Sequence, residues 1–283
     1  FVGATPSNTT LIDAFDTTTA GNAFDFGDAS AARYNNGFGG CASATRGVIA
    51  DGTLMEYVVF SSGGGSNEFG DHRLMGGGTG SGAIGHAADG VRGLLAGGYI
   101  APSNLNTIDF ITIATTGSSS EFGEFDDGST GGYSPMASST RAVFARAGQG
   151  INFINFTSGG KTQIFGDMRG DSRTAHVASC SSSTRGIMAG GEAPSRVNTI
   201  TFITLATLGN GTDFGDLLAG RNDHDAVSSS TRGFIVAGAN PSKTNSIEFV
   251  TIASTGNGQE FGDLTQARSQ PSCCSDVHGG LGD

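Results

Sequence analysis

The sequence predicts an all-β fold, a six-bladed propeller with four-stranded blades, and two repeated markers carry this prediction. The first marker is a triplet of Phe, Gly and an acid that returns six times, at intervals of 43 to 53 residues. The second marker is an Arg, mostly within a Thr-Arg-Gly triplet, that returns five times out of phase with the first. A repeat of roughly 40–50 residues made of short strands and glycine turns is typical of a propeller blade. We therefore expect residues 1–283 to form a single β-propeller domain.

The two markers divide the chain into repeat units. The triplets begin at Phe26, Phe69, Phe122, Phe165, Phe214 and Phe261. Their acids are Asp28, Asp71, Glu124, Asp167, Asp216 and Asp263. The Arg markers are Arg46, Arg92, Arg141, Arg185 and Arg232. Cutting after the residue that follows each Arg gives units of about 1–47, 48–93, 94–142, 143–186, 187–233 and 234–280. We expect each triplet Phe to wedge between neighbouring blades.

Each unit predicts four strands in the same order. In the unit 187–233, a short apolar run at 187–189 ends in a glycine pair, and a turn rich in Ala, Pro and Ser follows. A longer run of β-branched and aromatic residues covers 199–205, and a glycine turn then leads into the Phe-Gly-acid strand. A polar loop precedes the last strand before the next Arg. Strands bounded by turn residues, with no helical period sustained over three turns, indicate an all-β chain.

The register of the two ends predicts how the ring closes. The chain opens with Phe-Val-Gly-Ala at 1–4, which matches the second strand of a blade, as at 234–237. Residues 271–280 match a first strand. We therefore expect one blade to combine a C-terminal innermost strand with three N-terminal strands. Such closure removes sheet edges that would otherwise pair with other chains.

The repeat resembles the kelch repeat. It has a double glycine, a β-branched strand about eight residues later, an aromatic residue near the last strand, and a following Arg or His, as in Arg173 with His176 and Arg221 with His224. Kelch repeats carry Trp in the fourth strand, whereas this sequence has no Trp and uses Phe. The combination of Thr-Arg-Gly, Ala-Gly-Gly and Phe-Gly-Asp-Leu is also similar to repeats in uncharacterised structural and tail proteins of aquatic bacteriophages.

These resemblances imply a function by analogy with the fold. They imply a non-enzymatic surface structural or adhesion module, a phage virion or tail component that lies on the virion surface or outside the cell. Its partners would be other virion or surface proteins within a larger assembly, and cell-surface glycans. A protein-interaction adaptor of the kelch kind is the main alternative. A virion-associated polysaccharide-degrading enzyme is the third.

An enzyme of that third kind would need two or three acids close together in a cleft. Acids cluster at Glu124, Asp126 and Asp127, and again at Asp213 and Asp216. No phosphate loop, nucleophile elbow or zinc-protease motif occurs, and the sequence implies no cofactor. The five histidines fall at different blade positions, so repeat symmetry does not bring them together. The motifs therefore favour a chain that is not an enzyme.

Composition argues against two classes of partner. The net charge of −11 and a pI near 4.7 disfavour nucleic acid, whose binding depends on Lys and Arg contacts to phosphate. No apolar run approaches the 18 residues of a membrane span. Glycine accounts for 48 of 283 residues, and it recurs at periodic turn positions between apolar strands rather than in a disordered tract.

The cysteines are expected to be structural. Counting back five residues from each Arg leads to the small or apolar residues Cys41, Ala87, Met136, Cys180 and Val227, and Cys274 is their equivalent in the last unit. A buried position on the first strand explains this set. A disulfide between Cys41 and Cys274 is an open alternative, because ring closure would make their blades neighbours. Neither the spacing nor the histidine partners suit a metal site.

The Arg markers allow two interpretations. Five arginines at one blade position would form a ring around the axis, a trap for carboxylates, sulfates or phosphates. Alternatively, each Arg pairs with a triplet acid of its own or the next blade, and repetition favours this structural role. The ring would have a gap at Gly279, which stands where the last unit should carry its Arg.

Carbohydrate binding by the loops is a further hypothesis. Tyr99 and Asn104 lie in a turn with a Pro-Ser pair, and Tyr133 lies in the long insertion of the unit 94–142. Exposed aromatic rings next to amides and acids are suited to stacking on sugars and bonding to their hydroxyls. A Tyr in a glycine-rich turn can equally cover a core.

Overall fold

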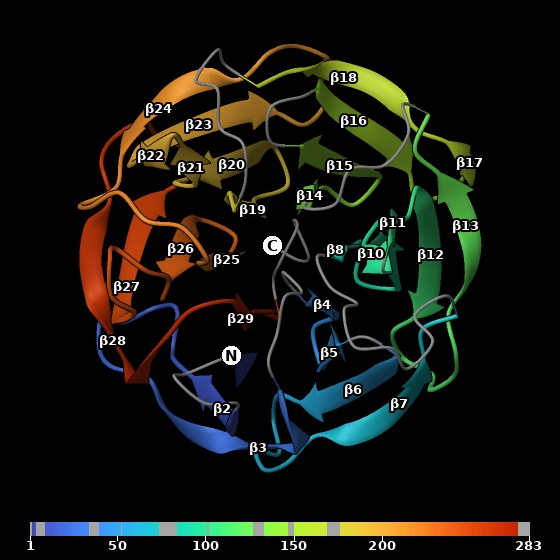
Figure 1. Cartoon of the computed structure of the whole chain (residues 1–283), viewed down its shortest axis with the longest axis horizontal. Coiled ribbons are helices and arrows are strands. Elements are labelled where there is room, and N and C mark those ends of the chain that lie inside the picture. The colour runs from blue at the N-terminus through green and yellow to red at the C-terminus, as the bar shows by residue number, and fades with distance from the viewer. Residues whose placement is uncertain are drawn as a thin grey trace.

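The chain is an all-β propeller, with its sheets arranged around a central axis (Figure 1). The computed structural model describes residues 2–3, 9–33, 40–51, 53–73, 84–100, 102–126, 133–146, 150–168 and 176–276. Every regular element in these ranges is a strand. The predicted all-β propeller architecture is therefore confirmed.

Five four-stranded blades make up most of the ring, each ordered from the axis outward as first, second, third and fourth strand. Blade 1 contains β4 (Cys41–Ala42), β5 (Arg46–Asp51), β6 (Leu54–Val59) and β7 (Asn67–Asp71). Blade 2 contains β8 (Gly85–Ala88), β9 (Arg92–Ala96), β12 (Thr107–Thr112) and β13 (Ser120–Glu124). Blade 3 contains β14 (Tyr133–Ala137), β15 (Arg141–Arg146), β16 (Gly150–Asn155) and β18 (Gln163–Asp167). Blade 4 contains β19 (Ala178–Ser181), β20 (Arg185–Ala189), β23 (Thr199–Thr204) and β24 (Thr212–Asp216). Blade 5 contains β25 (Asp225–Ser228), β26 (Arg232–Val236), β27 (Thr244–Thr251) and β28 (Gln259–Arg268).

The expected count of six four-stranded blades is wrong, because the described residues form five. Between blades 5 and 1 lie two separate two-stranded sheets (Figure 1). In one, β1 (Val2–Gly3) pairs with β29 (Pro271–Ser272); in the other, β2 (Thr9–Ala14) pairs with β3 (Phe24–Arg33). We call β1, β2, β3 and β29 the terminal unit. The described parts of β1 and β29 are each two residues long.

Short additional strands decorate the blades. The strand β17 (Gly160–Lys161) pairs in parallel with β13 of the preceding blade. Two small hairpins connect the second and third strands of blades 2 and 4. They are β10 (Tyr99–Ile100) with β11 (Ser103–Asn104), and β21 (Glu192–Ala193) with β22 (Ser195–Arg196).

The core is built from the inner strands of the blades. In β23 the side chains of Ile200 and Ile203 are buried, and the first strands of blades 2 to 5 are buried on both faces because neighbouring blades cover them. The triplet Phe of each blade packs against an aromatic residue of the third strand. Phe202 and Phe214 are a typical edge-to-face pair, with ring centroids 6.1 Å apart. The same pairing joins Tyr57 to Phe69, Phe110 to Phe122, Phe153 to Phe165 and Phe249 to Phe261.

The backbone of each triplet joins its strand to the following unit, a contact we call the clasp. At the edge of blade 4, Gly256 N donates to Phe214 O at 2.8 Å and Gly258 N donates to Asp216 O at 2.8 Å. A Cβ on Gly215 would lie 2.3 Å from Gly256 O, so this close approach requires glycine. The other triplets make the same contact through Gly64 to Phe26, Gly117 to Phe69, Thr162 to Glu124, Gly209 to Phe165 and Gly21 to Phe261.

Candidate functional site

The side chains of the Arg markers connect neighbouring units by hydrogen bonds. Each begins the second strand of its blade, and its guanidinium donates to a backbone carbonyl just beyond the third strand of the next unit. Arg141 Nη1 lies 2.9 Å from Leu205 O, and Arg185 Nη1 lies 3.0 Å from Ile252 O. The remaining contacts are Arg46 to Ile113, Arg92 to Phe156 and Arg232 to Thr18.

Four of these guanidinium groups also stack on aromatic rings of their own blades. The Cζ atom of Arg46 lies 4.1 Å from the centroid of Tyr57, and that of Arg185 lies 4.5 Å from the centroid of Phe202. Arg141 and Arg232 stack in the same way on Phe153 and Phe249. The Arg side chains therefore contact carbonyl oxygens and aromatic rings rather than the acids of the triplets. This geometry supports a structural role, and anion binding by the ring stays a prediction. Gly279 lies outside the described residues.

The glycine that follows four of the five Arg markers leaves room for the preceding unit, while Ala142 follows Arg141. A Cβ on Gly93 would lie 2.5 Å from Cys41 Sγ, and one on Gly47 would lie 2.5 Å from Cys274 Sγ. Cys180 packs against the equivalent glycine of blade 5 in the same way. All four cysteines are free, so the structure contains no disulfide between Cys41 and Cys274. Burial raises the pKa of Cys180 to about 12, which keeps its thiol protonated.

The sequence interpretation missed a set of buried polar residues on the third strands. They stand between an aliphatic residue and, in five of the six cases, an aromatic one: Asp13, Glu56, Asp109, Asn152, Thr201 and Glu248. Three of them pair with an Arg that follows the outer strand of the preceding unit. Arg73 contacts Asp109 at 2.8 Å, Arg268 contacts Asp13 at 2.8 Å, and Arg221 contacts Glu248. The recurring acid between Ile and an aromatic residue was the signal that could have revealed them.

The two faces of the ring carry different loops and different repeated residues. Consecutive loops of an antiparallel sheet alternate between its two ends. One face, the turn face, therefore carries the Arg markers and the clasp glycines, because both belong to the turns after first and third strands. The other, the hairpin face, carries the loops between second and third strands, and the starts of the first strands. The repeated contacts lie on the turn face, while the irregular hairpins lie on the hairpin face.

The predicted sugar-binding residues separate in the structure. Tyr99 is 38% exposed on its hairpin, directly opposite Asn104 in the strand register. Tyr133 is 2% exposed, so the expectation that it is available to a ligand is wrong. Its ring stacks on Phe125 with centroids 4.0 Å apart and also contacts Phe144, which makes it part of the core between blades 2 and 3.

Three polar residues form a row on the hairpin face near the axis. His176, Asp223 and Gln270 immediately precede the first strands of adjacent units, and all three have positive φ, between 53° and 59°. His176 Nδ1 lies 2.8 Å from Asp223 Oδ1, and Gln270 N donates to Asp223 O at 2.6 Å. The hydrogen bond to Asp223 raises the pKa of His176. Non-glycine residues seldom adopt this backbone conformation, so surrounding contacts must hold the row in place.

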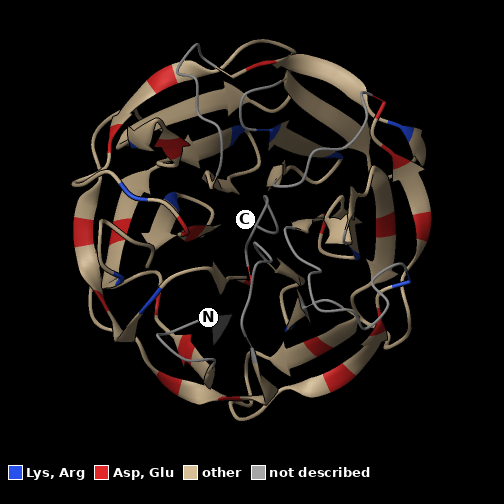
Figure 2. Ribbon diagram, viewed as in Figure 1, with Lys and Arg blue, Asp and Glu red and all other residues tan. Residues whose placement is uncertain are grey.

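The acids proposed for an enzyme are found on the outer surface. Glu124 and Asp126 both contact Lys161 Nζ, at 3.5 Å and 3.3 Å. Asp213 and Asp216 flank a buried Phe on β24 and are exposed. Figure 2 shows acidic residues along the outer strands around the ring. Charges on exposed outer edges discourage pairing with a strand of another chain. Asp127, like Arg173 of the kelch resemblance, lies outside the described residues.

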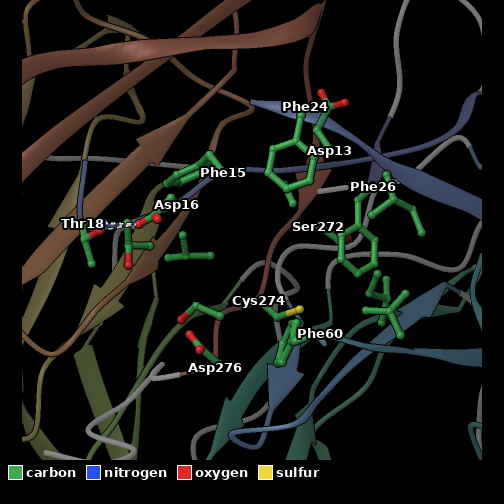
Figure 3. Close-up of a pocket in the computed structure, with 17 residues that line it drawn as sticks. Asp13, Phe15, Asp16, Thr18, Phe24, Phe26, Phe60, Ser272, Cys274 and Asp276 are labelled. Atoms are coloured by element: carbon green, nitrogen blue, oxygen red, sulfur yellow. Dashed lines mark hydrogen bonds between the residues drawn. The ribbon is translucent and has the colours of Figure 1, made fainter. Parts of the chain in front are cut away.

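A cavity of about 530 Å³ lies between the terminal unit and blade 1. Its wall is mainly apolar, and Figure 3 shows Phe15 and Asp16 on one side and Phe26 and Phe60 on the other. Cys274 and Asp276 line it from the segment that follows β29. Hydrogen bonds from the Thr18 hydroxyl and N–H lower the pKa of Asp16.

No protein-family model matches the chain, and no curated protein matches it. The resemblance to kelch repeats and to phage proteins thus depends on the repeat pattern alone. Among the described residues, no three or more His, Cys, Asp or Glu side chains are placed to hold a metal ion. The described ranges also contain no helix long and apolar enough to cross a membrane.

Proposed function

We propose that this chain is a non-enzymatic surface structural and adhesion module, and that its hairpin face binds a glycan or a partner protein. The observation that carries the proposal is the division of roles between the two faces. The repeated Arg and Phe-Gly-acid residues are engaged in holding neighbouring units together. The hairpin face instead presents an exposed aromatic ring and polar groups that differ from blade to blade. Binding sites commonly lie on such variable loops above a constant scaffold.

Two groups of residues on the hairpin face support binding. Tyr99 and Asn104 place a partly exposed ring beside an amide, since directly opposed strand residues have Cβ atoms about 4.5–5.5 Å apart. An aromatic ring of this kind offers an apolar face for stacking and a polar end for hydrogen bonding. The row of His176, Asp223 and Gln270 adds polar groups nearer the axis. A glycan needs both kinds of contact.

We further propose that the terminal unit closes the ring, with the C-terminal strand β29 against β1. Clasp hydrogen bonds from Gly21 and Ala23 to blade 5, and the packing of Cys274 against Gly47 of blade 1, support this closure. The chain would act on a phage virion or tail, in contact with other virion or surface proteins. Its acidic composition and low Lys content suit an exposed surface better than a nucleic-acid interface.

A binding screen with a matched pair of variants tests this function. The purified chain is incubated with an array of bacterial and algal glycans and with intact cells, alongside a heat-unfolded sample. Saturable binding that falls about tenfold in Tyr99→Ala supports the proposal, because stacking on one ring is worth about 1–3 kcal/mol at related sites. Leu208→Ala, an exposed residue on the turn face, is the control and should bind as the parent does. Release of sugar fragments, or equal loss in both variants, contradicts it.

A further inference from the structure

Two consecutive clasps contain an Asn followed by a Gly. Asn210 and Gly211 bind the outer strand of blade 3, and Asn257 and Gly258 bind the outer strand of blade 4. The other clasps have Ser, Thr or Ala in place of this glycine. A third Asn-Gly pair, at 36–37, lies outside the described residues. In such a pair the glycine nitrogen can attack the side-chain carbonyl carbon of the Asn, because glycine has no side chain that hinders the approach.

The closed clasp holds the reacting groups on separate atoms of one neighbouring residue. Gly258 N donates to Asp216 O at 2.8 Å, and Asn257 Oδ1 accepts from Asp216 N at 3.1 Å. The clasp on blade 3 has the same geometry, with distances of 2.9 Å and 3.0 Å. To react, the glycine nitrogen must lose its proton and reach Cγ of the Asn. It cannot do so while both hydrogen bonds hold, so the folded ring protects the pair.

An Arg marker of the preceding blade holds each of these turns. Arg185 Nη1 donates to Ile252 O at 3.0 Å, at the start of the turn that carries Asn257. Arg141 Nη1 donates to Leu205 O at 2.9 Å, at the start of the other turn. Both Asn residues are exposed to solvent on the turn face. Each Asn-Gly pair therefore has its own Arg, and one clasp can be loosened without the other.

We propose that Asn210 and Asn257 are self-modification sites, at which opening of the clasp leads to deamidation of the Asn. The glycine nitrogen loses its proton and bonds to Cγ of the Asn, while the bond from Cγ to Nδ2 breaks and that nitrogen leaves as ammonia. Water then adds to one of the two carbonyl carbons of the resulting succinimide. The product is Asp or isoaspartate, and no oxidation or reduction takes place. This reaction does not depend on ligand binding at the hairpin face.

Isoaspartate prevents the clasp from closing again. In this product the main chain runs through the former side chain, so the path from Cα of residue 257 to Gly258 N is longer by one methylene group. The donor and the acceptor then no longer match the spacing of N and O on Asp216. The outer strand of blade 4 loses its clasp hydrogen bonds permanently, and its open edge becomes a template for pairing with another chain.

The first test compares the folded and the unfolded chain. The whole chain is incubated at mildly alkaline pH with and without guanidinium chloride and is then digested. Liquid chromatography with mass spectrometry separates the Asn, Asp and isoaspartate forms of the peptides that contain Asn210 and Asn257. We expect both sites to react at least about tenfold more slowly in the folded chain, because only the small open population reacts. Equal rates in the folded and the unfolded chain would overturn the proposal.

A crossed pair of variants tests whether each site responds to its own clasp. In the folded chain, Arg185→Gln should raise the rate at Asn257 about fivefold, the change in open population expected for one lost hydrogen bond, and leave Asn210 unchanged. Arg141→Gln should do the reverse. Equal acceleration of both sites in each variant would assign the reaction to global unfolding and overturn the proposal. The comparison of the folded and unfolded parent chain stands even where a variant does not fold.

The variant Gly211→Ala is the matched control for the product. Ala23 holds this position in the clasp of the terminal unit and donates to Asp263 O at 2.8 Å, so Ala allows a clasp to form. Its methyl group hinders attack on Asn210, which should slow deamidation there several-fold in the unfolded chain. The parent chain, aged in denaturant and refolded, should then melt at a lower temperature than the variant treated in the same way. Equal melting temperatures would overturn the proposal.

Discussion

Blade 5 forms one continuous sheet, whereas the described strands of the terminal unit form two separate sheets. In blade 5, β26 pairs with both of its neighbours, and Phe249 packs on Phe261 at 5.8 Å. In the terminal unit, β1 contributes two residues, and Ala14 stands where blade 5 has Phe249. The sheet β2–β3 nevertheless keeps its position in the ring.

The contacts with blade 5 explain why β2–β3 stays in place. Gly21 N donates to Phe261 O and Ala23 N donates to Asp263 O, as in the other clasps. The buried pair of Arg268 with Asp13 adds a charged link between the same two units. The outer pair of strands β2 and β3 is therefore held in the ring by its contacts with blade 5. The predictions below test how far this holds.

Loss of the buried pair should have the largest effect. Arg268→Met should lower the free energy of unfolding by about 3–5 kcal/mol, because the carboxylate of Asp13 stays buried without its partner. Urea unfolding followed by circular dichroism measures this. The double variant Arg268→Met with Asp13→Leu removes both charges and should recover most of the loss. An unchanged unfolding midpoint in the single variant would show that the pair does not hold β2.

Equivalent phenylalanines should differ in their contribution to stability. Phe261 is 4% exposed and contacts Phe15, Phe234 and Phe249, so Phe261→Ala should cost about 3–5 kcal/mol. Phe26 borders the cavity and is only partly buried, so Phe26→Ala should cost roughly half as much. Equal losses of stability in the two variants, measured by chemical unfolding, would mean that the terminal unit is packed as tightly as a complete blade.

A buried histidine should make blade 5 sensitive to acid. Burial lowers the pKa of His224 to about 3, so between about pH 6.5 and 3 the unfolded chain binds a proton that the folded chain does not. Stability should therefore fall with pH by about 1.4 kcal/mol per unit below pH 6.5, or about 2 kcal/mol by pH 5. His224→Gln should flatten this slope. The terminal unit has Pro271 at the equivalent position, which does not titrate and adds nothing to this pH dependence of stability. A slope that the variant leaves unchanged would assign the acid sensitivity to other groups.

Replacing the Asn side chains of two clasps should lower the free energy of unfolding least, and by equal amounts. Asn257 Oδ1 accepts from Asp216 N at 3.1 Å, and Asn22 Oδ1 accepts from Asp263 N at 3.1 Å. Each Asn→Ala variant should cost about 0.5–1.5 kcal/mol, the typical worth of one hydrogen bond. Thermal unfolding of the two variants in parallel measures this. A cost for Asn257→Ala with none for Asn22→Ala would show that the clasp does not fasten the terminal unit.

The candidate site was less accessible to sequence reasoning than the fold. Tyr99 could be placed in an exposed turn, because its neighbours are turn residues. Tyr133 could not be placed in the core, because its burial depends on Phe125 and Phe144, and nothing in the local sequence shows that they stack on it. The row of His176, Asp223 and Gln270 belongs to three different units, so only the ring brings it together.

The sequence by itself determined the strands, the period of the repeat and the identity of the repeated residues. Alternation of apolar residues and placement of glycines are local properties, and they recur because every unit has the same neighbours. Only the tertiary structure decided that the Arg markers bond to carbonyls of the next unit, that the cysteines stay free, and that five sheets are complete. Each of these features depends on distances between atoms of different units. One of these units, the terminal unit, combines strands from both ends of the chain. Contacts of that kind are set by closure of the ring, which no single repeat encodes.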